Sequence, residues 1–359
     1  MTTGARTTQA PAQVPTKAVH QAIAAANTKK KTVYAIGTGG TISSWGSPRL
    51  TLMEYGVGGQ KLDIHGNIAR LPELADFVKV KGEQMFMAGS GSIGDEGWLK
   101  ISKRINELLK NPEIAGVVVT HGTSTLEEMA YWLNLTVRSE KPVCVTGTMR
   151  PPSALGTEAD NNLLGALVTA ASDEARGKGA LVVMADHIDA AREVTKSNSY
   201  RVETFQTREL GTLGYFDADL KPIFYRAPLR KHSHQSEFDI SKLDKLPQVE
   251  ILYSYEGASG MLAKCLIDNN VPGIIIAGTG AGGAGRDQGE ALQEARKKGI
   301  VVVATTRAGA GRVIRTERHK ADGWVAGDNL QPQKARILLK LALTKTKDVN
   351  EIQRMFDTY

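Results

Sequence analysis

Hydroxyl side chains follow the first buried strand that the sequence predicts. The run Thr32–Gly37 leads directly into Gly37-Thr38-Gly39-Gly40-Thr41. Glycines let the backbone turn sharply and approach a ligand closely, and a threonine hydroxyl beside a base can act as a nucleophile. A plain tight turn between a strand and a helix is the other interpretation. The motif therefore indicates either a nucleophilic site or a turn.

A second row of hydroxyls follows another predicted strand, Ile114–Thr120. Its sequence is His121-Gly122-Thr123-Ser124-Thr125, and Glu127 and Glu128 come next. Thr123 or Ser124 can cap the following helix, with one of the two glutamates in its first turn. Capping explains one hydroxyl but not three in a row. We therefore expect polar chemistry at the end of this strand too.

The elements that must position these hydroxyls alternate between strand and helix. Short β-branched runs are typical of strands buried on both faces, and apolar residues three and four positions apart are typical of helices. This alternation predicts a parallel sheet with helices on both faces, whose ligands bind at the carboxyl ends of the strands. The predicted strands are 32–37, 114–120, 142–147 and 180–185, and the helices are 96–110, 126–138 and 161–176.

The 359 residues are enough for two domains. We expect a disordered leader at 1–30, a large α/β domain at 31–216, a polar linker at 217–247 and a smaller α/β domain at 248–359. The leader is rich in Thr, Ala, Gln and Pro and lacks the apolar core of a secretory signal. We therefore expect a cytoplasmic protein, or a periplasmic one if a signal has been removed.

Composition and motifs exclude several other classes. The net charge of +7 comes from scattered basic residues rather than a focused patch, so a nucleic-acid partner is not expected. No apolar run approaches the roughly 18 residues of a membrane span. Gly278–Gly283 matches a dinucleotide-binding turn but lacks its later acidic partner, and His232 and His234 lack further metal ligands. We expect no cofactor, no metal and no membrane partner.

Four motifs together resemble the bacterial-type L-asparaginase/glutaminase family. They are Ile36–Ile42 (IGTGGTI), Val119–Glu128 (VTHGTSTLEE), Gly147–Pro151 (GTMRP) and Asn329–Leu338 (NLQPQKARIL), and the likeness extends from Lys31 to Tyr359. The resemblance implies a large N-terminal and a small C-terminal α/β domain. It also implies a small-molecule substrate and a homotetramer of close dimers, whose sites are completed by the neighbouring subunit.

The resemblance also implies catalytic roles. It assigns the nucleophile to Thr38, the assisting tyrosine on a flap to Tyr55, and the second threonine to Thr123. Backbone groups near Gly122 and Thr148 would stabilise an oxyanion.

Several polar positions depart from the family pattern. The family Asp after the second threonine is Ser124, and the relay lysine aligns with Asp173. The Ser-Gln pair that grips the substrate reads Ser90-Gly91, and the asparagine that reaches the neighbouring site aligns with Glu256. An acidic loop has become a segment that contains Arg312, Arg315 and Arg318. An ammonium that loses its carboxylate partner binds poorly, so free asparagine is not the expected substrate.

Three hypotheses remain open. The first is a hydrolase that uses the threonine on a different small amide, lactam or related carbonyl compound. The second is an isomerase or lyase in the same pocket, with Asp173 or Glu256 as its base. The third is a member of the family that binds a ligand without catalysis. Separately, the arginines at 312–318 either recognise an anionic substrate or form a solvated surface loop.

Overall fold

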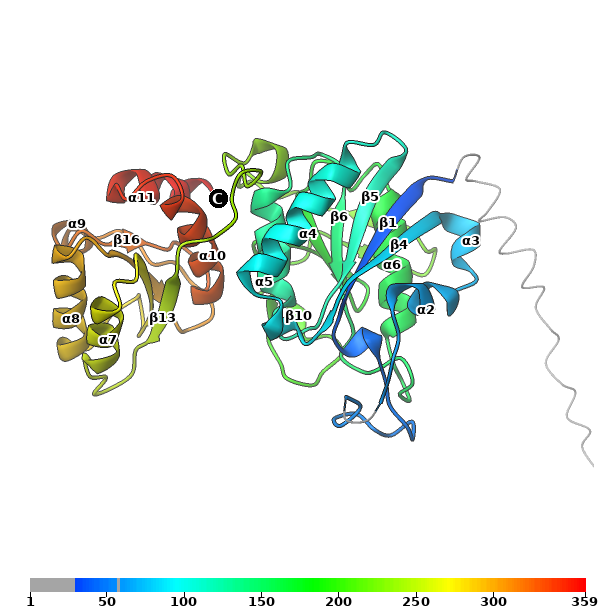
Figure 1. Cartoon of the computed structure of the whole chain (residues 1–359), viewed down its shortest axis with the longest axis horizontal. Coiled ribbons are helices and arrows are strands. Elements are labelled where there is room, and N and C mark those ends of the chain that lie inside the picture. The colour runs from blue at the N-terminus through cyan, green and yellow to red at the C-terminus, as the bar shows by residue number, and fades with distance from the viewer. Residues whose placement is uncertain (1–29, 57–58) are drawn as a thin grey trace, which may run out of the picture.

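The computed structural model describes residues 30–56 and 59–359. It contains a larger domain with a mostly parallel sheet and a smaller domain with a fully parallel sheet (Figure 1). The leader predicted at residues 1–30 lies, apart from its last residue, outside the described residues.

The larger sheet has eight strands. Five of them, from β7 to β4, are parallel, and β8, β11 and β12 extend the sheet in antiparallel fashion. In spatial order the strands are β12 (Pro222–Phe224), β11 (Gly214–Phe216), β8 (His187–Ala190), β7 (Ala180–Met184), β6 (Val143–Thr146), β5 (Ile114–Thr120), β1 (Thr32–Gly39) and β4 (Lys79–Ala88). β12 lies inside the segment predicted as a linker, so the sheet of the larger domain continues to Phe224.

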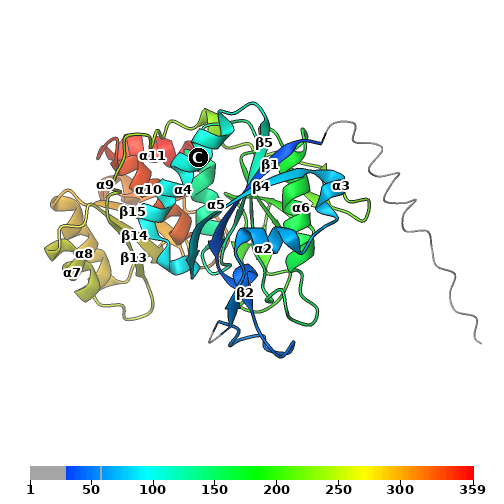
Figure 2. The same ribbon diagram turned by 45° about the vertical axis from the view of Figure 1, so that its right-hand side comes forward.

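Helices cover both faces of this sheet (Figures 1 and 2). Alternate residues of each central strand point to opposite faces, so Val117 packs with the side of α4 and α5 while Val118 packs with the side of α6. This is why the strands are apolar at almost every position. The helices are α2 (Ile64–Ala69), α3 (Leu74–Phe77), α4 (Gly94–Leu109), α5 (Leu126–Thr136) and α6 (Ala159–Ala171).

Short strands and 3-10 turns lie between the main elements of the larger domain. They are the hairpin strands β2 (Ser44–Trp45) and β3 (Gln60–Lys61), the pair β9 (Thr195–Lys196) and β10 (Phe205–Gln206), and the 3-10 turns η1 (Thr41–Ser43), η2 (Ser90–Ser92) and η3 (Ser233–Gln235). The hairpin and the β9 segment both lie near the carboxyl end of β1, where they form walls of the pocket described below.

The smaller domain has four parallel strands in the order β13 to β16. Helices α7 and α8 cover one face, and α10 and α11 lie on the face toward the larger domain. Its elements are β13 (Val249–Tyr253), α7 (Met261–Asp268), β14 (Gly273–Gly278), α8 (Arg286–Lys297), β15 (Val301–Thr306), α9 (Glu317–Ala321), β16 (Val325–Ala326), α10 (Pro332–Leu343) and α11 (Val349–Thr358).

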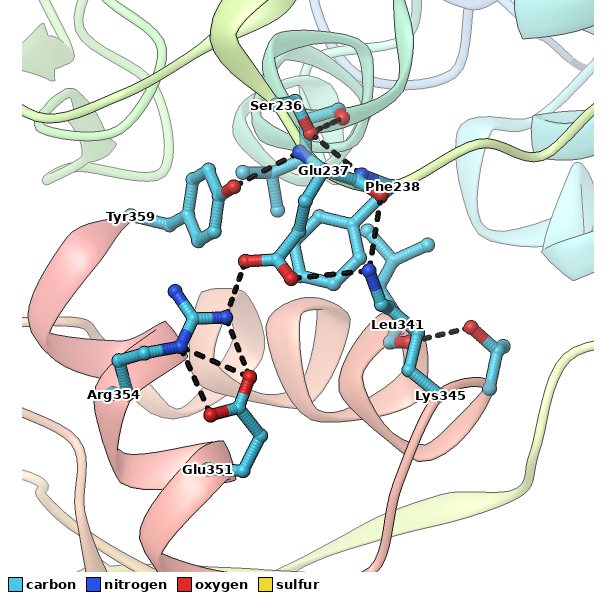
Figure 3. A network of polar contacts seen from close by, with 10 residues as sticks. Ser236, Glu237, Phe238, Leu341, Lys345, Glu351, Arg354 and Tyr359 are labelled. Carbon is cyan, nitrogen blue, oxygen red and sulfur yellow. Dashed lines mark hydrogen bonds and ion pairs between the residues drawn. The ribbon is translucent and has the colours of Figure 1, made fainter.

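The connecting segment is tied to the C-terminal helices by polar contacts (Figure 3). The Glu237 carboxylate accepts hydrogen bonds from Arg354 Nη2 at 2.7 Å and from Lys345 Nζ at 3.0 Å. The backbone N–H of Glu237 donates to the hydroxyl of Tyr359 at 2.9 Å. The segment between the two sheets is therefore fixed to α11 and to the turn that follows α10.

Candidate active site

A pocket of about 450 Å³ opens at the carboxyl ends of β1, β4 and β5. The chain crosses from β1 to β4 on one side and then to β5 on the other, and such a switch of direction leaves a crevice in an open α/β sheet. Its polar walls come from the turn after β1, from Ser90 after β4 and from residues 122–124 after β5. The two hydroxyl rows predicted from the sequence therefore meet at one edge of the sheet.

Two glycines aim Thr41 into this pocket. Gly39 and Gly40 have φ angles of +100° and +82°, a backbone region that residues other than glycine rarely adopt. A Cβ on Gly40 would also lie 2.3 Å from Gly122 Cα, so the two strand ends can approach only as glycines. The turn places Thr41 Oγ1 2.8 Å from the hydroxyl of Tyr55.

Thr38, the residue assigned as nucleophile from the motif, does not reach the pocket. Its side chain is 1% exposed, and its hydroxyl donates to the Thr120 carbonyl at 2.7 Å. Nδ1 of His121 lies 2.7 Å from Thr38 Oγ1. This ring nitrogen is the donor, because the proton of the Thr38 hydroxyl points at the Thr120 carbonyl. Thr38 precedes the glycine turn and faces the neighbouring strand β5. The motif contains two threonines, and the structure brings the second of them, Thr41, to the site.

Tyr55 lies between β2 and β3, on the segment that covers the pocket. Ser44 and Lys61 pair across this hairpin, and Lys61 Nζ donates to Ser44 Oγ at 3.0 Å. Both residues line the pocket together with Tyr55. Tyr55 therefore lies in the pocket wall, where its catalytic role stays a prediction, and the structure adds Lys61 as a cationic group.

A second polar pair lines the pocket. Lys196 Nζ donates to Thr123 Oγ1 at 2.9 Å, and both residues line the pocket. Burial lowers the pKa of the Lys196 ammonium, and the nearby Glu127 carboxylate opposes this effect. Lys196 is not among the site residues predicted from the sequence.

The prediction that Asp173 lies in the site is wrong. Asp173 forms an ion pair with Lys31 at 2.6 Å, and its side chain is 78% exposed. It follows α6, which returns the chain to the amino edge of the sheet before β7 begins. Residues that follow a helix in a parallel α/β unit lie at the edge opposite to the ligand. The amines that do line the pocket are those of Lys61 and Lys196.

The other predicted residues divide into two groups. Ser90, Gly122 and Ser124 line the pocket, with Ser124 exposed to it. Gly91 is next to Ser90 but outside the lining, and a Cβ there would meet no atom within 4 Å. Thr148 is fully buried and donates to the Arg150 carbonyl at 2.7 Å. Glu256 is exposed on the loop between β13 and α7 of the smaller domain, outside this pocket.

The charge of the pocket is positive. Lys61 and Lys196 line it, and among the described residues no Asp or Glu side chain does. The described residues also contain no group of three or more His, Cys, Asp or Glu side chains that could hold a metal ion. Within the same part of the chain, no helix is long and apolar enough to cross a membrane. The chemistry available in the pocket is that of hydroxyls and two amines.

Two family models match the chain. Residues 32–229 match the asparaginase N-terminal domain, and residues 248–356 match the glutaminase/asparaginase C-terminal domain. Together they cover both sheets, including the strand ends that form the pocket.

Similar proteins span nearly the full length. L-asparaginase 2 of Bacillus subtilis is 40% identical over 96% of this chain and 92% of its own length. A glutaminase-asparaginase of Pseudomonas fluorescens is 40% identical over 92% and 91%. The crystal structure of a probable cytoplasmic L-asparaginase from Campylobacter jejuni matches with a TM-score of 0.88 at 40% identity, covering 92% of this chain and all of the other. The sheet topology, the two domain matches and these relatives show that the chain belongs to the bacterial-type asparaginase/glutaminase family of amidohydrolases.

Proposed function

We propose that this amidohydrolase uses Thr41 as its nucleophile. The observation that carries the proposal is the 2.8 Å contact between Thr41 Oγ1 and Tyr55 Oη in the wall of the pocket. A threonine hydroxyl is a weak nucleophile until a neighbouring group receives its proton. Tyr55 lies within hydrogen-bond reach of that proton, and its flap position lets it approach a bound substrate.

The proposed reaction has two steps. Thr41 Oγ1 attacks the amide carbon, its proton passes through Tyr55 to the leaving nitrogen, and the C–N bond breaks to release ammonia. A water then attacks the Thr41 ester, the carboxylic acid leaves, and Thr41 recovers its proton. The Thr123–Lys196 pair lies close enough to the pocket to hold or accept a proton during either step.

We propose a substrate that carries an amide and a carboxylate but no free ammonium group. A carboxylate can pair with Lys61, which lines the pocket. Within its own chain, an ammonium would lose water without gaining an anion, because Ser124 stands where the resemblance places aspartate and no acidic side chain of the described residues lines the pocket. Free asparagine carries such an ammonium, whereas succinamate is the same molecule without it.

Ammonia release from the two amides tests this proposal. The wild-type protein should hydrolyse succinamate with a higher kcat/KM than asparagine. Ser124→Asp should raise kcat/KM for asparagine and lower it for succinamate, because it adds a carboxylate to the pocket wall. Ser124→Asn is the control of similar size without charge and should change neither preference. A wild-type preference for asparagine that Ser124→Asp leaves unchanged contradicts the proposed substrate.

The threonine ester can be tested independently. Acid quenching during turnover should leave the acyl group on the tryptic peptide 32–49, which contains both Thr38 and Thr41. Fragmentation should place the added mass on Thr41. An adduct on Thr38 of the wild-type protein contradicts Thr41 as the nucleophile. A Thr41→Ala variant that releases ammonia at the wild-type rate contradicts it as well.

The isomerase or lyase hypothesis loses Asp173 as its base, because Asp173 lies at the amino edge of the sheet. Glu256 is exposed on the smaller domain and lies outside the pocket of its own chain. A member that binds without catalysis remains distinguishable by the ammonia assay above. Arg312 contacts Asp328 of its own chain at 2.6 Å, which supports a structural role for this arginine.

We also propose a homotetramer of close dimers in the cytoplasm. The family resemblance supports the assembly, and exposed apolar side chains around Glu256 offer a surface for it: Tyr253, Tyr255, Met261 and Leu262. The C. jejuni relative that is described as cytoplasmic supports the location. Sedimentation of the purified protein at a mass of four chains is the expected result, and a monomer over the working concentration range contradicts it.

A further inference from the structure

A buried lysine of the smaller domain contacts the chain segment that carries Lys196. Lys334, near the start of α10, is 2% exposed. Its Nζ donates to the carbonyls of Ala191 at 2.9 Å and Arg192 at 3.1 Å, and also to that of Val194. All three N–H groups of this ammonium are therefore used on one turn of the larger domain. Lys334 belongs to the motif Asn329–Leu338, to which the proposed reaction gives no role.

That turn leads directly into β9. Thr195 and Lys196 follow it, and their side chains point in opposite directions. Lys196 Nζ reaches Thr123 in the pocket, while Thr195 Oγ1 donates to Gln331 Oε1 at 3.2 Å, just before α10. The start of α10 thus holds the segment of Lys196 from the side away from the pocket.

The same helix also contacts the segment that carries Thr123. Glu127, in the first turn of α5, is 7% exposed. Its Oε1 accepts a hydrogen bond from Gln333 Nε2 at 3.3 Å, and its Oε2 lies 4.0 Å from Lys334 Nζ with no hydrogen-bond partner among the described residues. Both halves of the Thr123–Lys196 pair are therefore connected to α10.

The charges around these groups are mutually dependent. Burial lowers the pKa of Lys334 to about 8, and Glu127 opposes this effect more than Glu193 and Asp189 do, while Arg192 reinforces it. Glu127 also favours the charged form of Lys196, whose pKa burial lowers. Glu127 is thus the anion that both lysines share.

We propose that Lys334 is a positioning residue, which acts with Glu127 to hold the side chains of Lys196 and Thr123 within hydrogen-bond distance of each other. The smaller domain of each chain then shapes the active site of the same chain. This inference rests on the proposed function, in which the Thr123–Lys196 pair takes part in turnover. Lys334 contacts neither the pocket nor the reacting atoms, so its loss should lower kcat and leave KM nearly unchanged.

The structure offers a matched control in the same helix. Lys340 is also 2% exposed, and its Nζ bonds Asp95 at 2.6 Å and the Pro247 carbonyl at 3.1 Å, away from the site. Lys334→Met and Lys340→Met therefore each remove a buried lysine from α10. Kinetics on the amide that the wild type hydrolyses fastest would be measured well below the Tm of both variants.

Lys334→Met should lower kcat by up to ~100-fold, the cost of a catalytic group displaced by about 1 Å. Lys340→Met should keep the wild-type kcat despite a lower Tm, and Lys334→Arg should restore part of the loss. Glu127→Gln should shift the pH profile of kcat to lower pH, because it removes the anion that favours charged Lys196. Equal kcat values for Lys334→Met and Lys340→Met overturn the proposal.

A second measurement does not depend on turnover. Hydrogen exchange of the amides of residues 190–197 should become faster in Lys334→Met than in Lys340→Met, and unchanged exchange there overturns the proposal as well. Thr123→Val and Lys196→Met distinguish a failure of the role proposed for this pair in turnover from a failure of the role proposed for Lys334. If these variants keep full activity, the role proposed for the pair in turnover fails, whereas the exchange result still decides whether Lys334 orders the segment.

Discussion

Thr38 and Thr41, at the end of β1, have very different surroundings although they are close in sequence. Thr38 is enclosed between β1 and β5, whereas Thr41 lies past the glycine turn beside Tyr55. His121 is fully buried, with Nδ1 bonded to Thr38 and Nε2 3.4 Å from Thr125 Oγ1. We assign Thr38 and His121 to the support of the turn, and Thr41 to the chemistry.

This support should depend on pH. Burial lowers the pKa of His121 from 6.5 to about 4, so the unfolded chain binds a proton more readily between these values. Stability from His121 is therefore present above pH 6.5 and is lost as the pH falls toward 4, by roughly 2 kcal/mol between pH 7 and pH 5. Urea unfolding at these two pH values should show this loss, and His121→Gln should reduce it. The same pH dependence in both proteins would exclude His121 as its source.

At the scale of elements, the C-terminal helices are attached through Glu237. Burial disfavours its charge, but hydrogen bonds from Arg354 and Lys345 outweigh this and hold its pKa below the usual value (Figure 3). Glu237→Gln should lower stability by about 1 kcal/mol at neutral pH, a small value because both cations are partly exposed. The difference from wild type should disappear as the pH falls through the lowered pKa, where the wild-type carboxylate is also protonated.

Thermal unfolding in low salt measures this difference. Glu96→Gln, which removes the exposed pair of Glu96 with Lys100, is the control and should leave the Tm unchanged. A Tm of Glu237→Gln equal to that of wild type at neutral pH would show that these contacts do not fasten the helices.

The elements differ in how well the sequence predicts them. Strands buried on both faces, such as β5 and β6, agree with their predicted bounds within one residue because they are runs of mostly β-branched residues. β4 was missed because it is an edge strand in which polar residues alternate with half-buried ones. The short antiparallel strands β8, β11 and β12 carry too few residues for a pattern.

The site residues also differ in how well the sequence predicts them. The glycine turn and the hydroxyl row after β5 were predicted, because both lie where parallel strands end. Lys196 was not, because it reaches the pocket from an irregular segment, through contacts far apart in sequence. Asp173 could have been excluded from topology alone, since residues between α6 and β7 lie at the amino edge.

At the scale of the whole molecule, one apolar core joins the two domains. Trp132 and Leu135 of α5 belong to the same buried cluster as Leu338 and Leu341 of α10. A core that continues across domains makes their unfolding cooperative. Calorimetry should therefore show one transition, which Val302→Ala in the smaller domain shifts as a whole to lower temperature. Two separate transitions, of which Val302→Ala moves one, would contradict a shared core.

Ammonia release by Thr41→Ala and Thr38→Val tests the central claim most directly. Thr41→Ala should lower kcat by at least about 1,000-fold with a Tm close to that of the wild type, because it removes the nucleophile and a single half-buried hydrogen bond, to Tyr55. Thr38→Val should keep kcat near the wild-type value but lower the Tm, because it leaves His121 Nδ1 without its buried partner. Thr41→Ala with wild-type activity, together with an inactive but folded Thr38→Val, would contradict the account and return the nucleophile to Thr38.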